Sequence, residues 1–168
     1  MSRGTLIHRC MQLVQLENCL TPEGAAQELR RLQEGPLQGE NLDRVPVGAI
    51  SDFARSQWGK LARENPCLRE YQFSALFSPK ELGLGEEEEE EILMNGVMDL
   101  VIQTPEGAII LDFKSDRVTP GEEEAHAARY APQLDIYARA YEKVWHCLLY
   151  TSGRGPAASP LGAGAGSL

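Results

Sequence analysis

Apolar residues in the first third of the chain recur about every three or four positions, which is the spacing of one helix face. This pattern predicts helices over residues 4–16, 22–35 and 47–63. Thr21 precedes the second helix and is suited to be its N-terminal cap. Residues 68–78 alternate between apolar and polar side chains instead, and this alternation predicts a β-strand.

A β-hairpin is predicted in the middle of the chain. Two apolar segments, residues 92–103 and 108–116, flank the sequence Thr-Pro-Glu-Gly, whose proline and glycine fit the second and fourth positions of a type I turn. If Thr104 pairs with Gly107, the register of the two strands is fixed. Asp99 then faces Asp112 across the hairpin, on the same side of the sheet.

Three charged side chains are therefore expected at the open end of this hairpin. Facing residues have Cβ atoms roughly 4.5–5.5 Å apart, so two carboxylates there repel each other. Lys114 lies two residues beyond Asp112 and points to the same face. One lysine satisfies two partly buried carboxylates poorly, whereas Mg²⁺ or Mn²⁺ would bind both. Spacing alone leaves a metal site and a salt-bridged strand end as equal alternatives.

The last third of the chain is predicted to contain one more helix and one more strand. Pro132 suits the first turn of a helix over residues 132–145, and residues 146–152 are expected to form the last strand. Residues 153–168 are rich in Gly, Ala, Ser and Pro and are expected to be a disordered tail. The six glutamates at residues 86–91 are interpreted as a solvated loop.

Composition narrows the function classes. The 168 residues are 42% hydrophobic and 24% charged, as in one soluble globular domain. No segment approaches the roughly 18 apolar residues of a membrane span, and no signal peptide is recognisable, so a cytoplasmic location without a membrane partner is expected. The four scattered cysteines favour reduced, buried thiols over zinc or an iron–sulfur cluster. A net charge of −9 disfavours DNA binding, unless a partner delivers the DNA or the carboxylates hold metal ions.

Five short motifs follow one another in a recognisable order: Gly-Thr-Leu-Ile-His at 4–8, Arg-Glu-Tyr-Gln-Phe at 69–73, Gly-Val-Met-Asp at 96–99, Asp-Phe-Lys at 112–114, and residues 129–140 with Gln133 and Tyr137. This set resembles the RecB-type branch of the PD-(D/E)xK nucleases. It is most similar to the C-terminal nuclease domain of the AddA subunit of bacterial AddAB helicase–nucleases. The resemblance extends over most of a domain of residues 1–152.

The resemblance implies a set of metal ligands. Asp99 and Asp112 would hold the ion, and His8 and the backbone carbonyl of Phe113 would complete its ligands. Without the motifs, a single histidine on a helix is more commonly a packed or surface residue. Glu70 is a further candidate for the site, although it could equally be a solvated strand end.

The resemblance also implies three catalytic residues beside the metal ligands. Lys114 would orient the attacking water and stabilise charge on the phosphate. Gln133 and Tyr137 lie four residues apart and so share a helix face. They would support Lys114 or contact the DNA backbone, although Tyr137 also fits an ordinary stripe of core residues.

The family further implies a fold, a reaction and partners. The fold would be α/β, with a restriction-endonuclease-like mixed central sheet flanked by helices. The reaction would be Mg²⁺- or Mn²⁺-dependent hydrolysis of DNA, carried out as an exonuclease on single strands during double-strand-break repair and recombination. The partners would be DNA, an AddB-like protein and a helicase motor of the same subunit, and the location would be the bacterial cytoplasm. The motor is expected outside these residues, because they contain no phosphate-binding loop. The alternatives are a catalytically silent DNA-binding or scaffolding module, and an iron–sulfur exonuclease of the same superfamily.

Overall fold

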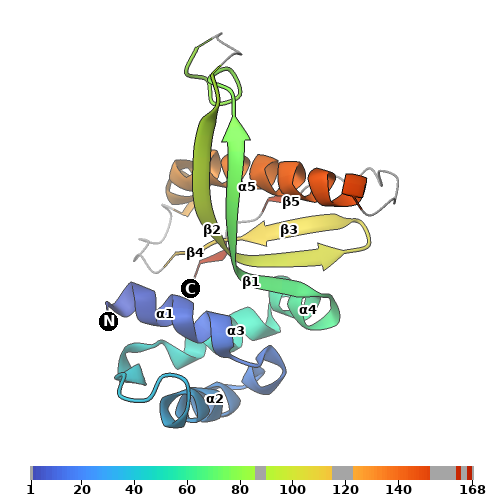
Figure 1. The fold of residues 1–168 in the computed structure, drawn as a ribbon. Helices are drawn as coiled ribbons and strands as arrows, with labels where there is room; N and C mark the ends of the chain where they lie inside the picture. Colours follow the sequence, from blue (N-terminus) through green and yellow to red (C-terminus); the bar gives the residue numbers. More distant parts are fainter. Residues whose placement is uncertain (1, 86–89, 115–122, 152–161, 164–165, 168) are drawn as a thin grey trace.

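A computed structural model describes most of the chain, apart from residues 1, 86–89, 115–122, 152–161, 164–165 and 168. For the helix ends 123–127 and 146–151, and for residues 162–163 and 166–167, it describes the backbone only. The part of the chain that it describes forms a central sheet with helices on both of its faces (Figure 1). The predicted α/β class with a flanked central sheet is therefore confirmed.

The N-terminal helices form a layer on one face of the sheet (Figure 1). Their bounds, with those of two short 3-10 helices, are α1 Arg3–Leu13, η1 Leu16–Cys19, α2 Pro22–Glu34, η2 Leu42–Arg44, α3 Val47–Arg55 and α4 Gln57–Glu64. The predicted N-cap of α2 is confirmed, because the Thr21 side chain accepts a hydrogen bond from the backbone N–H of Gly24.

The predicted helix over residues 47–63 is wrong in one respect: it is two helices, α3 and α4. Ser56 is extended, with φ −64° and ψ 165°, and its hydroxyl accepts from the backbone N–H of Gly59. The second helix then packs back on the first, so closely that a Cβ at Gly59 would lie 2.1 Å from the carbonyl oxygen of Phe53. The break follows from a serine that caps a new helix and a glycine that permits the contact.

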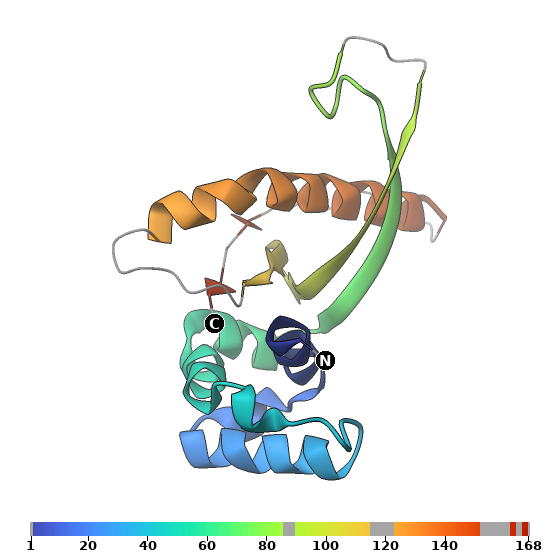
Figure 2. The same cartoon turned by 90° about the vertical axis from the view of Figure 1, so that its left-hand side faces the viewer.

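The sheet contains β1 Cys67–Phe77, β2 Ile92–Thr104 and β3 Gly107–Leu111 as antiparallel neighbours, with β5 Gly162–Ala163 parallel to β3 at its outer edge. The predicted hairpin register is confirmed from Thr104 opposite Gly107 to Leu100 opposite Leu111. Beyond the row of Leu100, β1 and β2 continue alone as a long two-stranded ribbon (Figures 1 and 2). A separate short strand, β4 Phe113–Lys114, pairs with β6 Gly166–Ser167.

The final helix, α5 Glu123–Thr151, crosses the other face of the sheet (Figure 2). Two predictions about this region are wrong. Pro132 lies inside the helix rather than in its first turn, and residues 146–151 continue the helix instead of forming a strand. The sequence between Pro132 and Gly153 holds no glycine or proline, so nothing in it ends the helix.

Two hydrophobic cores lie on the two faces of the sheet. The first, between the sheet and α1 to α4, contains the buried Cys10 and Cys19, which are free thiols as predicted. The second, under α5, includes Phe73, Val101 and Ile110. The side chain of Cys147 lies outside the described residues.

Other predictions concern parts of the chain that are only partly described. The glutamate run falls largely in residues 86–89, outside the described residues. In the predicted tail the structure describes only β5 and β6, so its disorder stays a prediction. Among the helices of the described ranges, none has the length and apolarity needed to cross a membrane.

Candidate active site

Three carboxylates occupy one row across the sheet, where the three-stranded part gives way to the two-stranded ribbon. On β1, Glu70 stands opposite Asp99 of β2, between the paired rows Arg69–Leu100 and Tyr71–Met98. Asp112 follows the last residue of β3, one step beyond the Leu100–Leu111 pair. The hydrogen-bonded ladder of the hairpin thus ends one residue before the facing aspartates that the sequence predicted.

At this row the regular alternation of the β2 side chains between the two faces of the sheet is broken. Val101 packs in the core under α5 and Leu100 in the opposite core, as in a regular strand. Met98 should share the face of Leu100, yet it packs under α5. Opposite this exchange, Glu70 has φ +52°, a left-handed conformation that costs a non-glycine residue about 1–3 kcal/mol. Strained backbone at one row re-aims the side chains of both strands.

Asp99 is turned toward α1. The His8 Nδ1 and the Asp99 Oδ1 lie 3.0 Å apart, and the backbone N–H of Phe113 donates to Asp99 Oδ2 at 2.6 Å. Both oxygens of this buried carboxylate are therefore held in place. The hydrogen bond to Asp99 raises the pKa of His8, and nearby negative charge adds to this effect against the opposing effect of burial.

His8, Glu70 and Asp99 bring one ligand atom each to a common place, all within 4.8 Å of one another. Two ligands at about 2.1 Å from one ion, at right angles, lie about 3.0 Å apart. The His8–Asp99 distance of 3.0 Å has this value, so an ion could replace the shared proton with little movement. Imidazole and carboxylate donors suit a divalent cation.

Asp112 forms the other half of the site. The residue is 6% exposed, and its carboxylate pairs with the Lys114 ammonium at 2.5 Å. Burial raises the pKa of Asp112, and the charge of Asp99 raises it further, while Lys114 and His8 oppose them. The expected convergence of Asp112 and Lys114 on one face is thus present. Asp99, by contrast, engages α1 rather than sharing Lys114.

A chain of polar contacts joins Lys114 to α5. Lys114 Nζ donates to the Gln133 side-chain oxygen at 3.3 Å, and the Gln133 amide donates to the Tyr137 hydroxyl at 2.7 Å. The Tyr137 ring packs edge-on against Phe73, with centroids 5.4 Å apart. Tyr137 therefore belongs to the core stripe and to the polar chain at once.

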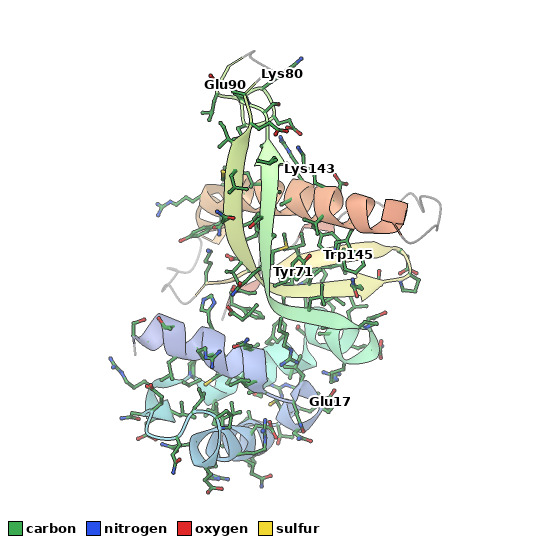
Figure 3. The ribbon with its side chains drawn as sticks, viewed as in Figure 1. Glu17, Tyr71, Lys80, Glu90, Lys143 and Trp145 are labelled. Carbon is green, nitrogen blue, oxygen red and sulfur yellow. The ribbon has the colours of Figure 1, made fainter. Side chains whose placement is uncertain are left out.

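Gly96 allows this packing. A Cβ at this position would lie 2.5 Å from Cε1 and 2.6 Å from Cζ of Phe73, and 3.2 Å from Cε1 of Tyr137. The first residue of the Gly-Val-Met-Asp motif is thus placed where only a hydrogen fits. Tyr71, two residues before Phe73 on β1, lies at the base of the two-stranded ribbon (Figure 3).

The sequence-based candidates thus gather in two adjoining clusters. Phe113 reaches the site through its N–H, and its carbonyl remains a proposed ligand. Glu70, weakly indicated by sequence, lies with His8 and Asp99. Tyr130 was missed: the Lys114 ammonium lies 4.3 Å from its ring centroid. Its position three residues before Gln133, on the same helix face, was a readable signal.

Comparisons with known proteins show the family of this chain. A family model described as the PD-(D/E)XK nuclease superfamily matches residues 1–158. A Clostridium novyi protein named as a subunit of an ATP-dependent helicase/nuclease is 31% identical over 152 residues, covering 84% of this chain. The proteins of the same name from Syntrophomonas wolfei and Bacillus cytotoxicus are each 32% identical, with the same coverage. The chain spans 12% of the length of each of these relatives. It belongs to the PD-(D/E)XK nuclease superfamily.

Proposed function

We propose that this chain is a Mg²⁺- or Mn²⁺-dependent deoxyribonuclease that hydrolyses DNA phosphodiester bonds. The observation that carries the proposal is the adjacency of two clusters. His8, Glu70 and Asp99 offer three ligand atoms within 4.8 Å, and the buried Asp112, paired with the half-buried Lys114, occupies the next position of the same row. A salt-bridged strand end would need only the second cluster.

His8, Glu70 and Asp99 would hold the ion, with Asp112 and the Phe113 carbonyl as further ligands. A bound ion supplies activation of water and stabilisation of charge on the phosphate. Neighbouring parts of the protein hold two of these ligands in place: the Phe113 N–H donates to Asp99 at 2.6 Å, and α1 carries His8. Such supporting contacts keep ligand geometry precise and their loss weakens metal affinity.

Lys114 is the proposed catalytic cation. Its ammonium is held by Asp112 at 2.5 Å, by the Gln133 oxygen at 3.3 Å and over the Tyr130 ring. A compact ammonium fixed in this way can orient a water molecule and stabilise charge that develops on a phosphate. Gln133 and Tyr137 would position Lys114, and their proposed contact with the DNA backbone is a second role.

The proposed substrate is single-stranded DNA, which the chain would degrade as an exonuclease during double-strand-break repair and recombination. Support comes from the relatives, which are named as helicase/nuclease subunits. A helicase motor and an AddB-like partner would feed the strand in the bacterial cytoplasm. This delivery would offset the net charge of −9 of the whole chain, which disfavours DNA capture by the chain alone.

The test separates metal binding from catalysis with Lys114→Ala. Calorimetry with Mn²⁺ should show affinity close to that of the wild type, because Lys114 is not a ligand. Cleavage of a labelled single-stranded oligonucleotide should fall by about 100-fold or more. Loss of Mn²⁺ affinity in Lys114→Ala would contradict the assigned role. Wild-type protein that binds Mn²⁺ without cutting DNA would point to a domain that needs its motor for substrate, and wild-type protein that does neither would favour a binding module.

A further inference from the structure

The end of α1 that follows His8 is held by an unusual set of contacts. One nitrogen of Arg69, Nη1, donates to the backbone oxygens of Val14 at 2.6 Å, Met11 at 3.1 Å and Gln12 at 3.2 Å. Arg69 lies on β1, more than fifty residues along the chain from this helix. Its side chain therefore fastens a strand to a helix terminus.

The rest of that terminus is also satisfied. The Arg31 Nη2 of α2 donates to the Leu13 oxygen at 3.1 Å, and the backbone N–H of Val14 donates to the Cys10 oxygen at 2.9 Å. The last carbonyls of a helix lack partners within it and carry partial negative charge. A guanidinium at this helix end donates hydrogen bonds to the last carbonyls and offsets their partial negative charge. Arg69 supplies the contacts that come from the sheet.

The same residue adjoins the candidate metal ligands. Arg69 immediately precedes Glu70 and pairs across the ladder with Leu100, the neighbour of Asp99. Met11 lies three residues after His8 on α1, close to one helical turn. One side chain therefore connects the strand row that holds two carboxylates to the helix that holds the imidazole.

We propose that Arg69 is a positioning residue that sets α1 along its axis so that His8 meets Asp99. The apolar face of α1 packs in the core below the sheet, but such packing is non-directional and fixes the axial position weakly. If α1 slid along its axis by the rise of one residue, His8 would move by about 1.5 Å, which is half of the 3.0 Å distance between His8 Nδ1 and Asp99 Oδ1. Polar contacts of defined length prevent this slide.

This inference rests on the proposed function only where it concerns metal affinity. Arg69→Met keeps the aliphatic stem and removes the donors. Arg63→Met is the matched control, because Arg63 of α4 also donates to a backbone oxygen near a helix end, that of Ala54. Arg69→Lys retains a cation with three N–H donors on one atom and should lie between wild type and Arg69→Met.

The first readout is Mn²⁺ affinity by calorimetry. Arg69→Met should weaken it by about 10-fold, and Arg63→Met should leave it unchanged even where both lower the melting temperature equally. Because Arg69 acts through His8, the double variant His8→Gln/Arg69→Met should bind Mn²⁺ no more weakly than His8→Gln. Losses that multiply in the double variant would overturn the proposal.

The second readout needs no metal. Imidazole ¹H–¹⁵N spectra of the metal-free protein, with His8→Gln to assign the signal, should show the His8 resonances shifted in Arg69→Met and unchanged in Arg63→Met. Unshifted His8 resonances in Arg69→Met would overturn the proposal. If the wild type binds no Mn²⁺, the metal site of the proposed function fails, and these spectra still decide the role of Arg69. Should Arg69→Met not fold, Arg69→Lys carries both comparisons.

Discussion

Glu70 and Asp99 face each other on β1 and β2 at the step where the ladder of paired residues is interrupted. Glu70 adopts a left-handed φ of +52°, while Asp99 bonds His8 and the Phe113 N–H. Strain on one strand thus coincides with a fixed carboxylate on the other. Strained backbone persists where its surroundings enforce it, and it concentrates at functional sites.

Replacing Glu70 should separate stability from metal binding. Glu70→Gly relieves the positive φ, so we expect the free energy of unfolding to rise by about 0.5–1 kcal/mol, measured by urea denaturation. Glu70→Gln keeps the strain and loses the same negative charge as Glu70→Gly, so it is the matched control and should be the less stable of the two variants. Both variants should bind Mn²⁺ more weakly because both lose a ligand oxygen. Equal stability of the two variants would argue that the φ value stores no strain.

Gly96→Ala should reduce both stability and cleavage. The new methyl group would lie 2.5 Å from the Phe73 ring and 3.2 Å from the Tyr137 ring, so at least one ring would have to move. Overpacking of this kind costs about 1–3 kcal/mol, measurable by thermal melting. Gly48→Ala in α3 is the control, since nothing lies within 4 Å of its Cβ, and it should instead be mildly stabilising. A stable Gly96→Ala protein with full activity would show that the close approach is unnecessary.

Metal binding should release protons from His8. The hydrogen bond to Asp99 raises the pKa of His8, so the proton stays bound to higher pH than in a free imidazole. Ligation requires the neutral ring, and Mn²⁺ affinity should therefore fall as pH falls. Calorimetry in two buffers of different ionisation enthalpy measures the released protons. The release should diminish in His8→Gln, and an undiminished release would assign it to another group.

Glu28 should make the fold sensitive to acid, independently of the active site. Burial opposes its ionisation, but hydrogen bonds from Arg31, the Gln15 N–H and Asn18 outweigh burial and lower the pKa of Glu28. A lowered carboxyl pKa adds stability above the ordinary value of about 4.5, and this stability is lost as pH falls through the folded-state pKa.

The corresponding measurement is urea unfolding from pH 7 to pH 3. Glu28→Gln should lose about 1–3 kcal/mol at pH 7 and lose less at pH 3, because pH 3 lies below the ordinary carboxyl pKa and this stabilisation has begun to be lost there. Glu34→Gln, at an exposed position of the same helix, is the control and should change little. A pH-independent loss in Glu28→Gln would mean that shape, rather than charge, explains the effect.

The sequence predicted correctly those features that depend on residues close together in the chain. The turn at residues 104–107 set the hairpin register, and Thr21 marked the start of α2. Proline misled the prediction for α5, because a helix tolerates Pro132 in its interior and the strand expected at 146–152 had no breaker before it. Short signals near helix ends are the least certain part of such predictions.

The site was predictable in composition but not in arrangement. Periodicity placed Asp99 and Asp112 side by side, and it cannot report the positive φ of Glu70 that exchanges the faces of β1 and β2. The sequence therefore predicted that Asp99, Asp112 and Lys114 converge on one face of the sheet. In the structure Asp99 bonds His8, a partner ninety-one residues away whose approach depends on the packing of α1.

The decisive experiment is cleavage of a labelled single-stranded DNA with Mn²⁺, with Mg²⁺ and with EDTA, for the wild type and Asp112→Ala. Asp52→Ala, at an exposed position on α3, is the matched control. We predict cutting that requires the metal, survives in Asp52→Ala and falls by at least about 100-fold in Asp112→Ala, while the melting temperature stays close to that of the wild type. Cutting that persists in EDTA or in folded Asp112→Ala would contradict a metal-dependent nuclease site at this row.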